Sequence, residues 1–571
     1  MPAGSTRCRM VPARASTMDN PRLFLFIALS FVVLLMWEAW QRDYGSKPPV
    51  ESPATETARP APSEAAPPAE DLPVAADTGS AAEQAPKLSL DEALLKRGER
   101  VRVITDVLDM EIDTVGGDLR RALLLKYPIS ASDPDVPVEL LNDKLPNLFV
   151  AQSGLRTPDG EEPTHHAHYS AAQSEYRLQP GQSELSVPLR WTSPQGIAVT
   201  KLYRLRPGSY VIDVEHQVRN ASSAEWRGRE YRQLQRTQIA EYGQSQFIHT
   251  YMGGVIYSPE EKYEKISFED MVEQNLSRTI TGGWAAMIQH YFLAAWIPPL
   301  SAPEHYYTKV LSGQRYVLGF IANQLTIPPG EEKVFKSRLY VGPKLQDKLG
   351  TVAPGLELTV DYGVLTVLAK PIFWLLEKIH SLTGNWGWSI ILLTLLIKLA
   401  FYKLSETSYR SMANMRKLAP RLQALKERYG DDKQKLNHAM MEMYKKEKIN
   451  PLGGCLPILV QIPVFISLYW VLLESVELRQ APFMLWLNDL SSADPFYVLP
   501  LIMGITMFIQ QKLNPAPLDP VQAKVMMVLP VVFTVFFAFF PSGLVLYWVT
   551  NNTLSIAQQW VITKRVEQGA A

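Results

Sequence analysis

The chain has 571 residues, a formal net charge of zero and 47% hydrophobic residues. This length exceeds that of an ordinary single domain, so we expect two or more domains. The zero net charge gives no global electrostatic reason to expect nucleic-acid binding. The two cysteines, Cys8 and Cys455, lie far apart and indicate no disulfide framework. The phosphate-binding motif G-x-x-x-x-G-K-S/T is absent, so the sequence gives no sign of an ATPase. We also expect no cofactor.

The N-terminal part of the chain contains one long apolar segment. Residues 1–17 read as a leader or a misassigned start, because translation could also begin at Met18. Residues 23–40 contain one charge and are long enough for a helix to cross a hydrocarbon core of about 30 Å. A cleaved signal peptide is the alternative. Trp37 and Trp40 at the end of the apolar run, and Tyr44 just after it, resemble an interfacial aromatic belt, so we expect an uncleaved transmembrane anchor.

A polar linker and a β-rich region follow. Residues 45–95 are rich in Pro, Ala, Glu and Ser without an apolar period, which predicts a disordered linker. Residues 98–345 contain short alternating or β-branched runs separated by Gly and Pro turns, which predicts an all-β sandwich. The predicted strands are Val101–Thr105, Asp109–Thr114, Ser186–Thr192, Ala198–Leu205, Tyr210–Val218, Tyr306–Ala322 and Lys333–Val341.

The C-terminal part is predicted to be helical and membrane-embedded. Residues 361–382 read as an amphipathic interfacial helix that Pro371 should kink or split. Five apolar spans follow at residues 386–404, 455–473, 496–510, 525–540 and 544–560, and residues 561–571 form a short tail. The expected fold is a membrane α-helical bundle, with an N-terminal anchor and a five-helix core, carrying a large all-β domain.

Charge in the loops predicts the orientation of these spans. Residues 405–450 contain eleven Lys or Arg and six Asp or Glu, whereas residues 474–495 contain one base and four acids. Positive loops mark the cytoplasmic side. Both termini and residues 405–450 are therefore expected in the cytoplasm, and residues 41–385 in the periplasm.

Lys398 lies inside the first of the five spans. A lysine at the centre of a membrane helix costs about 2.5–3.5 kcal/mol, so it usually faces water or a partner. It lies near the end of its span, however, and could instead extend to the interface. Thr394, Lys398, Tyr402 and Ser405 would share one face of a continuous helix.

Other spans supply polar side chains to match Lys398: Gln461, Thr506, Gln510, Tyr547 and Asn551, with a second stripe of Asn552, Ser555 and Gln559 that starts from Trp548. Hydrogen bonding between helices is the commoner use of such residues. Since no acidic residue lies well inside the five spans, we favour a water-filled groove around Lys398.

The loop 405–450 predicts a helical hairpin, with arms at Tyr409–Tyr429 and Lys433–Lys448 broken at Gly430. Flexible methionines suit promiscuous apolar contacts, but they could equally hold the two arms together. The candidate contact residues are Met412, Met415, Arg416, Met440 and Met441.

Three histidines, His165, His166 and His168, follow Pro163 in a polar loop. The sequence offers no nearby cysteine and no second cluster at ligand spacing, so it does not favour a metal site.

Four stretches of the C-terminal region carry a family resemblance: Gly384–Ile391, Asn450–Pro457, Ser475–Phe483 and Phe540–Trp548. They resemble the YidC/Oxa/Alb insertase family. The stretches Met18–Arg22 and Thr105–Asp109 extend the likeness to the full-length members of Gram-negative bacteria.

The resemblance implies a membrane insertase and chaperone of the bacterial inner membrane, not an enzyme, with a periplasmic β-supersandwich. It implies a hydrophilic groove open to cytoplasm and lipid, whose intramembrane cation is usually arginine. Lys398 stands at that position and keeps the charge without the planar guanidinium. The implied partners are nascent inner-membrane proteins, the Sec translocon with its accessory subunits, the ribosome and the lipid bilayer.

One expected partner and the alternative functions remain to be considered. The tail carries only Lys564 and Arg565, so we do not expect it to hold ribosomes. The alternative functions are a small-solute transporter or channel, and a membrane-tethered periplasmic binding or enzymatic domain. We see no second copy of the five-span pattern, although transporters often contain repeats.

Overall fold

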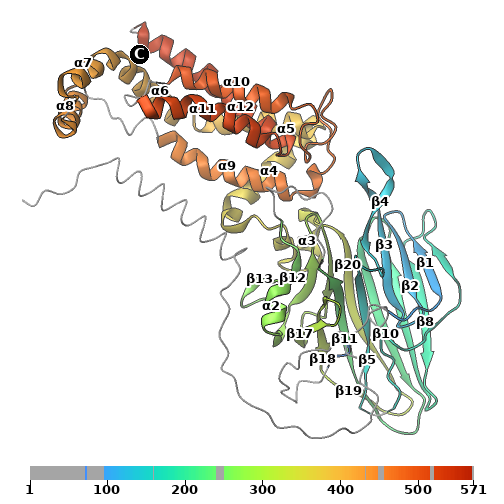
Figure 1. Ribbon diagram of the computed structural model, residues 1–571. Coiled ribbons are helices and arrows are strands. Elements are labelled where there is room, and N and C mark those ends of the chain that lie inside the picture. Colours follow the sequence, from blue (N-terminus) through green and yellow to red (C-terminus); the bar gives the residue numbers. More distant parts are fainter. Residues whose placement is uncertain are drawn as a thin grey trace, which may run out of the picture.

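The computed structural model describes residues 71–73, 95–158, 160–238, 250–430, 432–447, 456–514 and 520–568. The expected leader at 1–17, the anchor at 23–40, Cys8 and Cys455 lie outside these residues, as does most of the expected linker at 45–95. Two bodies are visible, a β domain (residues 100–343) and a helical bundle that follows it (Figure 1).

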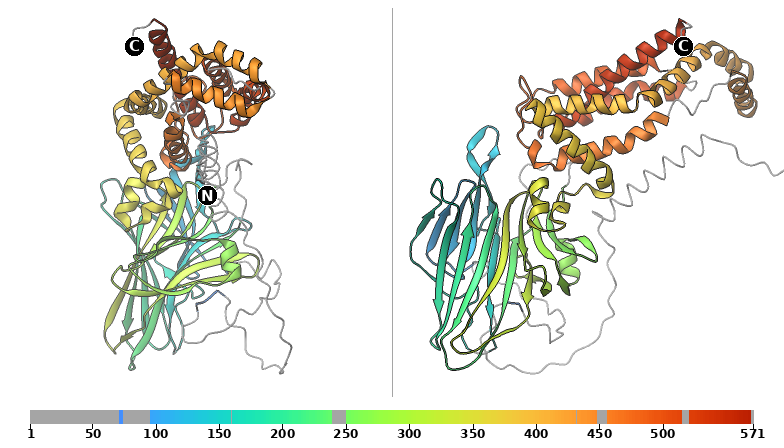
Figure 2. Two further views of the ribbon diagram at one scale, coloured as in Figure 1. Left: turned by 90° about the vertical axis from the view of Figure 1, so that its left-hand side faces the viewer. Right: turned by 180° about the vertical axis from the view of Figure 1, so that it is seen from behind.

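Two large sheets build the described part of the β domain, and they face each other (Figure 2). The 11-stranded sheet contains, in spatial order, β14 (Ser277–Thr281), β17 (Pro303–Leu311), β18 (Arg315–Ala322), β11 (Trp226–Thr237), β5 (Phe149–Arg156), β3 (Asp118–Ser130), β2 (Leu108–Asp113), β1 (Arg100–Ile104) and β7 (Glu175–Arg177), with β19 (Leu325–Ile327) paired to β11 and β4 (Asp133–Leu141) paired to β3. The 9-stranded sheet contains β13 (Lys262–Ile266), β12 (Gly253–Ser258), β15 (Trp284–Ile288), β16 (Phe292–Ile297), β20 (Glu332–Pro343), β10 (Val211–Asn220), β9 (Ile197–Leu205), β8 (Leu185–Thr192) and β6 (Ser170–Ala171).

Alternation of side chains explains why these segments form a sandwich. In β9 every second residue is buried, as the two-residue period of a strand requires. This period places Lys201 on the inner face, where its ammonium lies 3.2 Å from Oδ1 of Asp118 and donates to the carbonyl oxygens of Gly116 and Ser153, both at 2.9 Å. One predicted strand is wrong in its extent. The run 306–322 is a hairpin of β17 and β18, because Gly313 and Gln314 adopt positive φ in a turn.

The helical part begins with short elements below the bundle. They are α3 (Gln346–Val352), the 3₁₀ turns η1 (Leu356–Thr359) and η2 (Gly363–Leu365), and α4 (Thr366–Thr383); the small α2 (Phe268–Glu273) belongs to the β domain. Pro371 lies within α4 and does not split it. One face of α4 buries Phe373 and Leu376, while Val367 and Leu382 on its other side are exposed. A helix with two apolar faces suits a position between protein and lipid.

The bundle itself contains the five helices that were expected to span. They are α5 (Trp386–Ala400), α9 (Leu456–Glu474), α10 (Val498–Leu513), α11 (Pro520–Phe537) and α12 (Ser542–Glu567). Between α5 and α9 lie α6 (Tyr402–Lys417), α7 (Ala419–Tyr429) and α8 (Lys433–Lys446). The expected span 386–404 ends early, because the chain bends by 70° between α5 and α6. Beyond the bend Lys403 is almost fully exposed, as a charged side chain leaving an apolar helix must be.

The hairpin also differs from the expected one. Its first arm breaks at Leu418, and Pro420 stands at the start of α7, where a missing N–H costs nothing. As a result α6 packs along α12, and only α7 and α8 form a hairpin.

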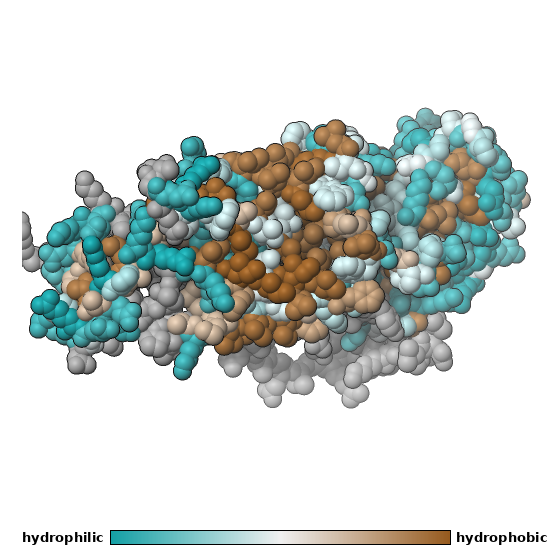
Figure 3. Space-filling view, turned by 90° about the horizontal axis from the view of Figure 1, so that it is seen from above, coloured by the Kyte–Doolittle hydropathy of each residue, from teal (hydrophilic) through white to brown (hydrophobic). Residues whose placement is uncertain are grey.

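An apolar belt covers the outside of the bundle (Figure 3). Its exposed members are Leu392, Leu395, Leu396 and Leu399 on α5, Leu501, Ile502, Ile505, Phe508 and Ile509 on α10, and Val525, Met527, Val528, Leu529, Val531, Val532, Val535 and Phe536 on α11. Exposed apolar surface of this size marks contact with a membrane or a partner. Among the described residues no individual helix meets the length and hydropathy of a membrane span, while α5 and α6 together meet them as a bent pair.

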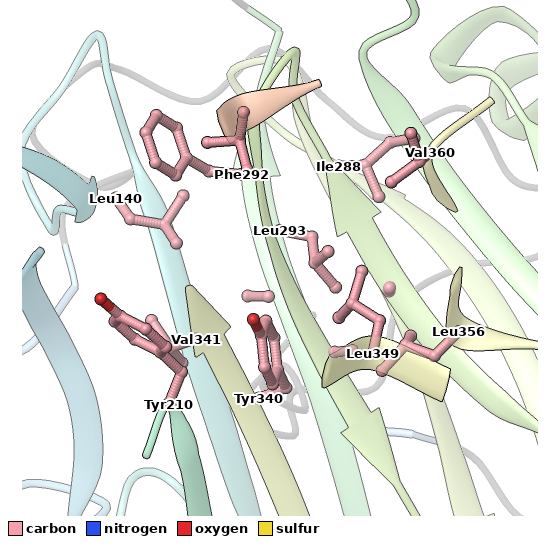
Figure 4. Packing of buried hydrophobic residues seen from close by; sticks show 14 of the residues in the cluster. Leu140, Tyr210, Ile288, Phe292, Leu293, Tyr340, Val341, Leu349, Leu356 and Val360 are labelled. Carbon is pink, nitrogen blue, oxygen red and sulfur yellow. The ribbon is translucent and has the colours of Figure 1, made fainter. Parts of the chain in front are cut away.

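The β domain and the bundle are joined by packing and by polar contacts. A cluster of buried apolar residues continues from the strands into α3 and η1, and Figure 4 shows Leu293, Leu349 and Leu356 within it. His290 donates from Nε2 to the carbonyl oxygen of Leu473 at 2.9 Å. Arg479, after α9, donates to the carbonyl oxygen of Ile129 in the β3–β4 hairpin at 3.0 Å.

Candidate functional site

Lys398 lies near the end of α5 and faces α12. It is half-buried, and its ammonium donates a hydrogen bond of 2.6 Å to Oγ of Ser555. The Ser555 hydroxyl in turn donates to the carbonyl oxygen of Asn551, one turn earlier, at 2.7 Å. Among the described residues no carboxylate oxygen lies within 4.0 Å of this ammonium. Its hydrogen-bond partner, the Ser555 hydroxyl, is neutral.

Amides from two helices extend this group. Gln461 on α9 donates from Nε2 to Oδ1 of Asn551 at 2.6 Å, and it also hydrogen-bonds Tyr547. We call Lys398, Gln461, Tyr547, Asn551 and Ser555 the lysine cluster. A cavity of about 10 Å³ lies beside it, lined by Lys398, Ser405, Gln461 and their apolar neighbours. This is room for about one water molecule.

A second polar group lies on the neighbouring face of α12. Asn552 donates to Oγ1 of Thr506 at 3.3 Å, and Gln510 donates to Oε1 of Gln559 at 2.5 Å. We call Thr506, Gln510, Asn552 and Gln559 the amide cluster. A cavity of about 190 Å³ adjoins it between α10, α11 and α12, lined by Met507, Gln510, Gln511, Asn514, Met526, Leu529, Pro530, Trp548 and Asn552.

The predicted groove residues thus fall into two groups rather than one. Ser555 joins Lys398, although its sequence position suggested the other stripe. Thr394 is fully buried and donates to the carbonyl oxygen of Ile390 in its own helix at 2.7 Å. Tyr402 lies beyond the bend at Phe401, so it does not continue the face of α5. The predicted stripe is therefore not straight, because the bend interrupts it after Lys398, although Ser405 lines the same small cavity as Lys398.

The candidate contact residues of the hairpin also separate. Met440 is buried with Leu418, Leu422 and Tyr444, so it holds α7 and α8 together. Met441 next to it is 39% exposed. Met412 and Met415 on α6 are half-buried, and Arg416 is exposed. Of the named methionines, Met441 is the one whose side chain is offered most openly to a partner.

A third polar group lies in the β domain, and sequence analysis missed its carboxylate member, Asp71. His165 and His166 meet the carboxylate of Asp71, which comes from the segment before the first strand. No sequence pattern connects Asp71 with residues 94 positions later, because only the folded chain brings them together. His168 does not join them; it is exposed and contacts the carbonyl oxygen of Tyr169.

Comparison with known proteins covers almost the whole chain. Residues 100–375 match the family described as the YidC periplasmic domain, and residues 378–569 match the family described as the 60Kd inner membrane protein. The chain is 55% identical over 555 residues to the membrane protein insertase YidC of Methylococcus capsulatus, covering 97% of this chain and 100% of the relative. It is 56% identical over 554 residues to that of Alkalilimnicola ehrlichii, covering 96% of each chain.

A solved structure described as an active YidC insertase with its first transmembrane domain resolved also matches, at 17% identity and a TM-score of 0.37, covering 81% of this chain and 93% of that one. The family assignment rests on the sequence matches alone. Those relatives are named as insertases and not as enzymes, and the matched families are an inner-membrane protein and a periplasmic domain. The chain belongs to the YidC family of membrane protein insertases, located in the inner membrane with a periplasmic β domain.

Proposed function

We propose that the lysine cluster is the place where the polar flank of an inserting protein enters the membrane. The observation that carries this proposal is the position of Lys398, a cation on an otherwise apolar helix that donates its hydrogen bond to an uncharged hydroxyl. A cation in this setting attracts acidic groups more strongly than it would in water, because the surrounding dielectric constant is low.

The neighbouring amides supply the hydrogen bonds that a polar segment loses on leaving water. Gln461 and Asn551 bond to each other, and each can exchange that bond for one to a backbone group of the client. Only about one water fits beside Lys398, so the client displaces these contacts rather than entering an empty channel. The larger cavity at the separate amide cluster offers a second place where polar side chains can meet the client.

The apolar belt on α5, α10 and α11 completes the pathway. The client's hydrophobic segment leaves the polar surface sideways and passes into lipid beside the belt. Removing its apolar surface from water yields roughly 25 cal/mol per Å², which drives insertion without nucleotide hydrolysis. The chain lowers the barrier for the polar flank and performs no covalent step.

The orientation follows from charge. The hairpin of α7 and α8 and both chain ends lie in the cytoplasm, and residues 41–385 lie in the periplasm, since 405–450 is strongly basic and 474–495 is acidic. The exposed Met441 and Arg416 receive clients that arrive from a ribosome or chaperone. The Sec translocon and its accessory subunits are the further partners that we assign to the protein.

The test replaces Lys398 in the full-length protein. Lys398→Ala should reduce insertion of a single-span substrate with an acidic periplasmic flank by about tenfold, since a hydrogen bond to a charged group contributes about 1.5–3 kcal/mol. Lys398→Arg keeps the charge and should retain most of the activity. Lys403→Ala is the matched control, because Lys403 is exposed beyond the bend.

Substrates with a neutral flank should depend less on Lys398. Normal insertion by Lys398→Ala at wild-type abundance would remove Lys398 from the pathway. Solute flux through reconstituted vesicles without protein insertion would favour the transporter instead.

A further inference from the structure

A short segment ahead of the β domain is fastened to its surface. The expected linker at 45–95 is wrong for residues 71–73, because Asp71 and Pro73 are buried against the β domain. The carbonyl oxygen of Asp71 accepts from Nε2 of Gln233 at 3.2 Å, and that of Pro73 accepts from Arg156 at 2.8 Å. Asp71 is only 8% exposed.

The carboxylate of Asp71 is held between two imidazoles. Its Oδ2 lies 3.0 Å from Nε2 of His165, and its Oδ1 lies 2.8 Å from Nε2 of His166. The three ligand atoms lie within 4.8 Å of one another. Two imidazole nitrogens and one carboxylate are a donor set that Zn²⁺ prefers, with water as the fourth ligand.

The surroundings of His165 support a ligand role. Its Nδ1 lies 2.5 Å from the hydroxyl oxygen of Tyr231, which fixes the ring and allows Nε2 to be the coordinating atom. Nε2 is fully buried and has no well-aligned hydrogen-bond partner among the described residues.

We infer that Asp71, His165 and His166 bind a divalent transition-metal ion, with Zn²⁺ as the first choice. The ion joins residues 71–73 to the loop after Pro163, and it thereby holds this segment against the β domain. This site lies in the β domain and does not depend on the groove proposed above.

A latch without metal is the competing explanation, in which Asp71 simply accepts hydrogen bonds from the two histidines. The two explanations differ in one measurable property. The metal site predicts stoichiometric binding that requires all three side chains, whereas the latch predicts no binding beyond that of exposed histidines.

The experiment uses the full-length protein in detergent, freed of metal with a chelator and titrated with Zn²⁺ by calorimetry, and native mass spectrometry counts the bound ions. The wild type should bind one ion at this site. Asp71→Asn and His166→Ala should each weaken binding by at least about tenfold, because loss of even an outer-shell partner costs that much. His168→Ala is the matched control and should leave the affinity unchanged, since the His168 side chain is exposed and contacts the carbonyl oxygen of Tyr169 rather than Asp71.

Asp71→Asn keeps the shape of the side chain, so it should fold, and circular dichroism verifies this. Absence of binding by the folded wild type would overturn the inference. Equal binding by wild type, Asp71→Asn and His166→Ala would also overturn it, as would an equal loss on changing His168.

Discussion

Lys398 on α5 and Ser555 on α12 are joined by a hydrogen bond of 2.6 Å. The hydroxyl proton of Ser555 is already donated to the carbonyl oxygen of Asn551, so its oxygen is free to accept from the ammonium. The pair fixes the position of the cation without neutralising it. In the proposed pathway, the cation therefore remains available to an acidic group of the client.

Removing the hydroxyl should loosen this arrangement. Ser555→Ala is expected to lower the free energy of unfolding of the bundle by about 1.5–3 kcal/mol, the value for a hydrogen bond to a charged group. Thermal unfolding in detergent measures the change. Ser467→Ala is the matched control, because the Ser467 hydroxyl donates to the carbonyl oxygen of Pro463 in its own helix. An equal effect of the two substitutions would contradict a special role for the Lys398–Ser555 bond.

The buried lysine of the β domain offers a second prediction. Lys201 and Asp118 are both completely buried and lie 3.2 Å apart. Lys201→Met should destabilise the β domain by about 3–5 kcal/mol, because it breaks a buried ion pair. Asp118 would keep only Arg120, at 3.5 Å, and the carbonyl oxygens of Gly116 and Ser153 would lose their donor. Urea unfolding of the β domain measures this loss, with Lys336→Met as the exposed control.

Lys201→Met also separates the role of the β domain from that of the helical bundle. Since we assign insertion to the bundle, Lys201→Met should retain most insertion activity at equal abundance. Loss of insertion in proportion to the loss of β-domain stability would show that the β domain takes part directly.

Alternation and hydropathy predicted most of the fold because they follow directly from burial. The alternating residues of β9 and β10 lie in strands, and the five apolar runs lie in α5 and α9–α12. The 70° bend at Phe401 was not predictable, since neither proline nor glycine marks it. Composition identified the polar residues of the bundle but could not assign them to clusters.

At the candidate sites, sequence analysis mainly failed to predict which residues far apart in the chain contact each other. Ser555 was placed in the wrong stripe, because one turn of α12 can face two different neighbours. Asp71 lies in a segment whose composition predicts disorder, so its contact with His165 could not be expected. Pairing between segments far apart in the chain depends on the tertiary fold, which local patterns do not contain.

Glu477, in the turn after α9, provides a pH-dependent prediction. Burial, with the nearby carboxylates of Glu377 and Asp347, raises the pKa of Glu477 to about 7 from 4.5. A raised carboxyl pKa favours the folded state while the group is protonated. Stability from this group is thus complete below about pH 4.5 and is lost as the pH rises through 7.

Glu477→Gln should remove that loss. The variant should unfold at a higher temperature than the wild type at pH 8, and the two should differ little at pH 4.5. Glu332→Gln changes an exposed carboxyl and serves as the control. The assignment would be contradicted if the difference in unfolding temperature between Glu477→Gln and the wild type did not grow from pH 4.5 to pH 8.

The most direct test of the groove asks which walls of the bundle meet water. Single cysteines at Gln461 and Asn551, in a chain whose Cys8 and Cys455 are replaced by serine, are treated with a membrane-impermeant maleimide from the cytoplasmic side. Leu396 and Leu399 on the apolar belt are the control positions. Faster labelling at Gln461 and Asn551 than at the two leucines is the predicted result. Equally slow labelling at all four positions would mean that the surface around Lys398 is dry, and the proposed pathway would be wrong.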